Sequence, residues 1–180
     1  MSRRVKGLRF ARELRTRPSC IPLGRARGPK ALGVRYEKAF AKMLPEAEHG
    51  HWFEYLDDEG RHFCQVDFIW QIPSTLALVV LETKYTWVAE GHEQIEFLYA
   101  PVVQLARQLQ VRPGGVVVCK SLTPETRGRT YGIYDDLEIA ALSAHKDRRI
   151  VFQWLPGTGL SSRIMGERGK PVDSARALGF

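Results

Sequence analysis

The sequence predicts an α/β protein, a sheet whose faces are covered by helices. Short aliphatic or aromatic runs of strand length alternate with stretches whose apolar residues recur at three- and four-residue steps. The expected order is a helix, three strands, a helix and a strand, with an added C-terminal helix and strand. With 180 residues, of which 44% are hydrophobic, the chain is long enough for one folded domain with extensions.

The first half of the chain predicts one helix and three strands. Apolar spacing favours a helix over about 31–44, with Pro45 beyond it as a stop signal. Residues 51–57 and 62–70 alternate like strands around the tight turn DDEG, so they predict a hairpin. The third strand is expected over 76–87, where the aliphatic run is typical of a strand covered on both faces.

The second half predicts two helices and two strands. A helix is expected within 93–110, and Pro101 inside it predicts either a kink or a second helix that begins there. A buried strand follows over 116–121, then a helix over 134–147 with Asp135 or Asp136 as the N-cap, then a strand over 150–155. Glycine, serine and charged residues dominate 156–180, which we expect to be a flexible tail.

The positive charge is concentrated at the N-terminus. Residues 1–30 hold ten Lys or Arg and one acid, a net charge of +9, while the other 150 residues carry a net charge of −2. A basic arm on a near-neutral core domain (31–155) suits an acidic polymer, most commonly nucleic acid. A solvated tail without a dedicated role and a targeting segment are the alternatives. The ten cations are Arg3, Arg4, Lys6, Arg9, Arg12, Arg15, Arg17, Arg25, Arg27 and Lys30.

Other features narrow the function classes. No apolar run approaches the roughly 20 residues that span a bilayer, so no membrane association is expected. The three cysteines have neither disulfide-framework nor zinc spacing, which favours a reducing interior. His49, His51 and His62 lack the partners of an HNH-type nuclease, so they are expected to be loop or strand residues, and no phosphate-binding loop is present.

The segment FCQVDFIWQIPSTLALVVLETKYTW, residues 63–87, carries the chemistry. Asp67 lies within one predicted strand, and Glu82 and Lys84 end the next. Strand side chains alternate, so Glu82 and Lys84 share a face. Charges there are costly to desolvate unless they pair or bind a metal. A solvated Asp67 and an ordinary Glu82–Lys84 ion pair are the simpler alternatives.

Glu37 adds a third carboxylate from the first predicted helix. Val34, Phe40, Ala41 and Leu44 stand at helical spacing around it, so Glu37 lies on or beside the apolar stripe. It either reaches water at the edge of the stripe or faces the other acids.

This arrangement resembles the PD-(D/E)xK nuclease superfamily, which has the restriction-endonuclease-like fold. In that pattern an acid on the first helix precedes an Asp on the second strand and an acid-x-Lys on the third. The matching positions are Glu37, Asp67 and E82-T83-K84, within about 31–121. Val66 stands where the motif has proline, so the match is weaker there. The runs LETKYTW (81–87) and FLYAPVVQLA (97–106) also resemble those of small nuclease-like proteins of bacteriophages.

The resemblance implies a magnesium- or manganese-dependent deoxyribonuclease. Asp67, Glu82 and the carbonyl of Thr83 would bind Mg²⁺ or Mn²⁺, with Glu37 binding directly, through water or at a second metal. Lys84 would position or deprotonate the attacking water. Gln104 would be the glutamine that such proteins often carry on the second core helix, or else a surface residue.

The sequence therefore predicts a metal-dependent phosphodiester hydrolase that acts on DNA. The alternative is a non-catalytic DNA-binding or structural protein, for instance of a phage particle, with a nuclease-like fold. The expected location is the cytoplasm, or a phage particle within a bacterial host. A homo-oligomer is compatible with the sequence, which shows no interface.

Overall fold

The computed structural model describes residues 4–22, 24, 26–122, 130–134, 137–147, 150–157 and 160–165. Asp135 and Asp136, the expected N-caps, lie outside these ranges, as do Arg3 and Arg25 of the basic arm. Within the described part, no helix is both long and apolar enough to cross a membrane.

One mixed sheet of eight strands organises the protein, in the order β1-β2-β3-β4-β5-β7-β8-β6. Neighbouring strands are antiparallel except for the parallel pairs β4–β5 and β5–β7. The strands are β1 (Phe10–Leu14), β2 (Glu48–Asp57), β3 (Gly60–Gln71), β4 (Leu78–Thr86), β5 (Gly114–Ser121), β6 (Thr130–Tyr134), β7 (Ile150–Trp154) and β8 (Leu160–Met165).

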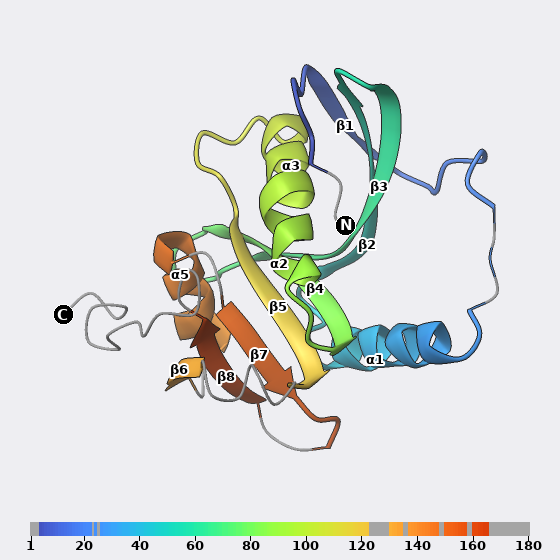
Figure 1. Ribbon diagram of the computed structural model, residues 1–180. Coiled ribbons are helices and arrows are strands. Elements are labelled where there is room, and N and C mark those ends of the chain that lie inside the picture. The colour runs from blue at the N-terminus through green and yellow to red at the C-terminus, as the bar shows by residue number, and fades with distance from the viewer. Residues whose placement is uncertain are drawn as a thin grey trace.

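Helices cover both faces of this sheet (Figure 1). On one face lie α1 (Pro29–Met43) and α5 (Leu137–Asp147), whose apolar side chains share a core with β3, β4, β5 and β7. On the other face lies a continuous helical segment made of α2 (Glu90–Gln94), a π-helical turn η1 (Ile95–Tyr99) and α3 (Ala100–Ala106). The predicted α/β class and helix-covered sheet are confirmed.

The elements expected between residues 31 and 155 are all present in the expected order, with small shifts of their ends. Pro101 explains the composite helix. Proline has no N–H to donate and its ring clashes with the carbonyl four residues earlier, here that of Phe97. The wider π turn just before it accommodates the ring, and α3 then begins with Pro101 in its first turn.

The predicted domain limits need two corrections. The basic arm is not separate from the core, because β1 pairs with β2 and Val5, Leu8 and Ala11 pack against the core on the α3 face. The stretch from 156 is not a uniformly flexible tail, because β8 pairs with β7 and β6. Residues 166–180 lie outside the described ranges.

Gly115 allows the helical segment to lie close to the sheet. A Cβ built on it would stand 2.6 Å from Cγ2 of Ile95 in η1. A side chain there would therefore push η1 away from β5. This contact fixes the distance between the sheet and α2, which contributes to the site described next.

Candidate active site

The site lies where β3 and β4 diverge. Their paired residues end at Phe68 opposite Leu81, so Asp67 and Glu82 are the next residues along the two strands. The Asp67 carboxylate fills the opening: its Oδ2 accepts hydrogen bonds from the Thr83 backbone N–H at 2.9 Å and the Thr83 hydroxyl at 2.7 Å. Asp67 thus replaces a backbone carbonyl that the ladder no longer supplies.

Side-chain alternation changes at Asp67. Cys64 and Val66 pack in the core on the α3 face, whereas Phe68 and Trp70 pack in the core on the α1 face. A regular strand would place Val66 and Phe68 on one face, and here they lie on opposite faces. On β2 the register places Gly50 opposite Asp67, and Gly50 has a φ of 72°, which favours glycine. Both strands of the hairpin are irregular at this level.

Thr83 directs its backbone toward the same opening. In a strand, the N–H and C=O of one residue point to the same neighbour. Because the Thr83 N–H points at Asp67, its carbonyl also faces the β3 side. The oxygen that the family resemblance assigns to a metal therefore lies on the same edge as the Asp67 carboxylate.

Glu82 and Lys84 lie on the face covered by α2. Nζ of Lys84 donates to Oε1 of Glu82 at 2.5 Å and to Oε1 of Gln94, in α2, at 2.7 Å. Glu82 is only 4% exposed, and its second oxygen, Oε2, is buried with no hydrogen-bond partner among the described residues. A buried carboxylate oxygen without a donor is unfavourable unless a cation completes it.

The electrostatics agree with this geometry. Burial, reinforced by the charge of Asp67, raises the pKa of Glu82 to about 8, although Lys84 opposes the shift. Burial also raises the pKa of Glu37, again with a contribution from Asp67, while His49 opposes it. The three carboxylates therefore repel one another and favour a shared cation.

Glu37 faces these acids. It projects from α1, its side chain is 22% exposed, and Oε1 lies 2.8 Å from Nε2 of His49 on β2. The His49 ring in turn stacks on Phe68, with 4.8 Å between the ring centroids. His49 is a residue of strand β2, within the loop-or-strand expectation from the sequence. Its contact with Phe68 holds it beside the candidate site.

The structure assigns the glutamine of the site differently from the sequence. The Gln104 side chain donates to the Leu109 carbonyl at 3.4 Å, near the end of α3. Gln94 contacts Lys84 instead. Gln94 precedes Gln104 by ten residues, which corresponds to roughly 15 Å along a helix. Gln94 lies inside the helix predicted within 93–110, but the family resemblance points to Gln104 and gives no signal for Gln94.

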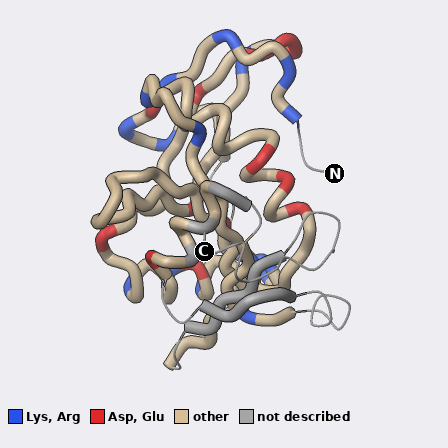
Figure 2. The backbone as a smooth tube through the Cα atoms, turned by 90° about the vertical axis from the view of Figure 1, so that its left-hand side faces the viewer, with Lys and Arg blue, Asp and Glu red and all other residues tan. Residues whose placement is uncertain are grey.

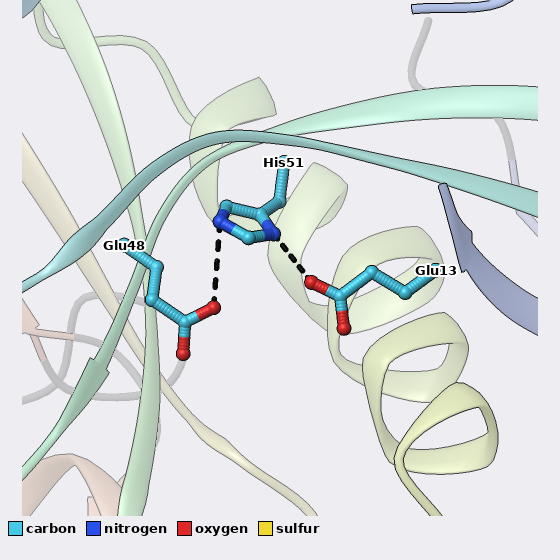
Figure 3. Close-up of side chains that lie close together, drawn as sticks. All are labelled: Glu13, Glu48 and His51. Atoms are coloured by element: carbon cyan, nitrogen blue, oxygen red, sulfur yellow. Dashed lines mark hydrogen bonds and ion pairs between the residues drawn. The ribbon is translucent and has the colours of Figure 1, made fainter. Parts of the chain in front are cut away.

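A second polar cluster lies on β1 and β2 (Figure 3). His51 lies between two acids, with Nδ1 against Glu13 and Nε2 3.4 Å from Glu48. Among the described residues, this is the one group of three whose candidate ligand atoms lie within 4.8 Å of one another, so Glu37, Asp67 and Glu82 are more widely spaced.

Arg107 already occupies the position a cation would take in this second cluster. Its guanidinium bonds both oxygens of Glu48, at 3.0 and 2.5 Å, and Glu13 at 3.0 Å. These bonds hold the pKa of Glu48 below its usual value. The cluster therefore acts as a clamp that joins β1, β2 and the end of α3.

The cations of the basic arm divide into two sets. Some are bound internally: Arg12 pairs with the buried Glu54, and Arg9 bonds the Asp57 carbonyl. In Figure 2 basic positions gather in the upper part of the molecule, where Figure 1 places β1 and the end of the β2–β3 hairpin. Within the described part of the chain, Arg4 and Arg17 make no ion pair but contact aromatic rings. The cations that make no ion pair, side-chain hydrogen bond or ring contact with any described residue are Lys6, Arg15, Arg27 and Lys30.

Comparison of this chain with protein-family models, with curated proteins and with solved structures gives no match.

Proposed function

We propose that the protein is a metal-dependent nuclease that hydrolyses phosphodiester bonds of DNA. The observation that carries the proposal is Oε2 of Glu82, a buried carboxylate oxygen without a donor at the opening that Asp67 and Thr83 line. Its elevated pKa reflects an environment that disfavours the charge unless a cation is present. The restriction-endonuclease-like arrangement of these residues is the second support.

The donor set fits a hard divalent cation. Asp67, Glu82 and the Thr83 carbonyl offer only oxygen, which Mg²⁺ and Mn²⁺ prefer, and so few carboxylates leave positions for water. Glu37 would bind directly, through water or at a second ion, as the family resemblance implies; the three carboxylates are not a set whose oxygens all lie within 4.8 Å of one another. When bound, the ion would polarise the scissile phosphate and lower the pKa of a bound water.

Lys84 is the group that would act on the reacting atoms. Its ammonium has three donors, of which Glu82 and Gln94 take two. The third is available for the attacking water or for a phosphate oxygen. Gln94 fixes the direction of the ammonium, because its oxygen lies 2.7 Å from Nζ on the side of α2.

DNA is the proposed substrate because of the cations that no described acid neutralises. These cations lie in the N-terminal segment and are Lys6, Arg15, Arg27 and Lys30. Strand β1 joins part of that segment to the sheet. Binding through such groups releases counterions, so affinity would fall steeply as salt concentration rises.

Cleavage assays test the proposal. Linear, circular and branched DNA are incubated with Mg²⁺, with Mn²⁺ or with EDTA, and native protein is compared with Lys84→Met and Asp67→Asn. The matched control is Lys42→Met, an exposed lysine at the end of α1. Metal-dependent cutting that both site variants lose and the control retains is the expected result. Binding without cutting under every metal condition would refute the nuclease and favour the non-catalytic DNA-binding alternative.

A further inference from the structure

A groove beside the candidate active site has no role in the chemistry described above. Its volume is about 590 Å³, within the range of small-ligand sites. One wall is the segment 13–17 at the end of β1, and the other is the segment 49–52 of β2. Because Leu14 is still paired with Trp52, the groove lies where the chain leaves β1 after Leu14 and runs beside the start of β2.

The groove combines cationic and aromatic side chains. Arg15 is exposed and makes no ion pair with a described residue, and Trp52 is half-buried on the opposite wall. The Arg17 guanidinium lies over the Trp52 ring, 5.9 Å from its centroid, and bonds the Ile21 and Pro22 carbonyls. Arg17 therefore braces the wall that faces Trp52.

The acidic residue in the groove is neutralised from outside it. Glu13 lines the groove, but its carboxylate contacts His51 and the Arg107 guanidinium. Arg15 and Arg17 therefore determine the electrostatic potential in the groove, which is positive. Such a potential favours a polyanion over a cation or a neutral ligand.

The groove leads to the carboxylates. His49 lines it and bonds Glu37 at 2.8 Å. Gly50 also lines it, and Gly50 stands between His49 and His51, which pair with Phe68 and Val66 on either side of Asp67. The groove therefore ends at His49 and Gly50, beside Glu37 and the strand that carries Asp67.

We propose that this groove binds single-stranded DNA next to the scissile bond, with a base stacked on Trp52 and a phosphate on Arg15. Cationic grooves with aromatic platforms are the general means of holding single strands. A single strand is favoured because an unpaired base can stack on Trp52, whereas the bases of a duplex are stacked on one another. The inference rests on the proposed nuclease function for its direction toward Asp67, and its binding test does not need cleavage.

The test measures binding of a labelled oligothymidine by fluorescence anisotropy in EDTA, over a series of salt concentrations. Trp52→Ala is expected to weaken binding by about 5- to 100-fold, and Trp52→Phe to retain most of it. Arg15→Ala is expected to lower the slope of log affinity against log salt by about 0.7. Lys42→Ala, the matched control outside the groove, should bind as the native protein does. Thermal melting confirms that each variant is folded.

Unchanged binding by both Trp52→Ala and Arg15→Ala would overturn the groove assignment, even if the protein cleaves DNA. Tighter native binding to duplex DNA or to single-stranded RNA than to the oligothymidine would overturn it as well. If the groove variants lose binding while the native protein cuts no DNA with any metal, the groove stands and the nuclease proposal alone fails.

Discussion

Replacing Glu82 by glutamine separates the demands of the site from those of the fold. The carboxylate is buried, one of its oxygens has no donor, and its pKa is raised to about 8 from an ordinary 4.5. Glutamine has nearly the same shape and carries no charge. In the absence of metal, we therefore expect Glu82→Gln to be more stable than the native protein at neutral and alkaline pH. In the presence of metal, we expect Glu82→Gln to be inactive as a nuclease.

The magnitude follows from proton linkage. A carboxyl whose pKa is higher in the folded state binds its proton more tightly there, so its contribution to stability is complete below pH 4.5 and is lost as pH rises to about 8. Each pH unit within that window costs up to about 1.4 kcal/mol. Between pH 5 and pH 8 the native protein should therefore lose roughly 4 kcal/mol from this group, and Glu82→Gln should not.

The assay is urea unfolding in EDTA at pH 5, 6, 7 and 8, followed by circular dichroism, for native protein and Glu82→Gln. Glu46→Gln is the matched control, because Glu46 is exposed and is not part of the site. The difference in unfolding free energy between native protein and Glu82→Gln should widen steadily with pH. The difference between native protein and Glu46→Gln should stay constant. Added Mg²⁺ should stabilise the native protein at pH 8 and leave Glu82→Gln unaffected.

Parallel pH dependence of native protein and Glu82→Gln would refute this reasoning. It would mean that Glu82 is ionised in the folded protein throughout the window, held by Lys84 alone. The unpartnered oxygen would then not be a demand for a cation, and the metal proposal would lose its main support.

Three further outcomes test the framework around the site. Gly115→Ala should lower the unfolding free energy by about 1–3 kcal/mol in urea titrations, because the new Cβ would lie 2.6 Å from Ile95. Tyr36→Phe should cost about 1 kcal/mol in the same assay, since it removes the hydrogen bond of 3.0 Å to the Trp154 carbonyl. Gln94→Leu should slow the proposed metal-dependent cleavage by about 10-fold with little change in melting temperature, because the acceptor that orients Lys84 is lost.

The sequence was sufficient to place Glu37 on the helix stripe and Glu82 beside Lys84, whereas the change of alternation at Asp67 could not be predicted from a period of two. Glu82 and Lys84 share a face as the alternation predicts, and Glu37 faces Asp67. Gln94 could not be found in this way. Its position depends on where the helix begins over β5, and that is decided by packing against the sheet and by the π turn before Pro101.

Strand β1 escaped prediction for a different reason. It is an edge strand, with Phe10 44% exposed and Arg12 bound to Glu54 of the neighbouring strand. An edge strand of this kind buries little apolar surface, and charges protect it from further pairing, so its sequence looks like that of a solvated basic segment. Its position follows from cross-strand ion pairs, which no local pattern reveals.

The divergence of β3 and β4 gives Asp67 and Glu82 unequal roles. Asp67 satisfies two donors of Thr83, so it is needed for the fold as well as for any metal, and Asp67→Ala would confuse the two. Among the described residues, Glu82 bonds Lys84 alone and its Oε2 has no donor, an arrangement that favours neither stability nor a unique fold. A residue that makes the protein less stable and holds no other element in place is better explained by a ligand than by packing. The experiments on Glu82 therefore decide the function more cleanly than those on any other residue of the site.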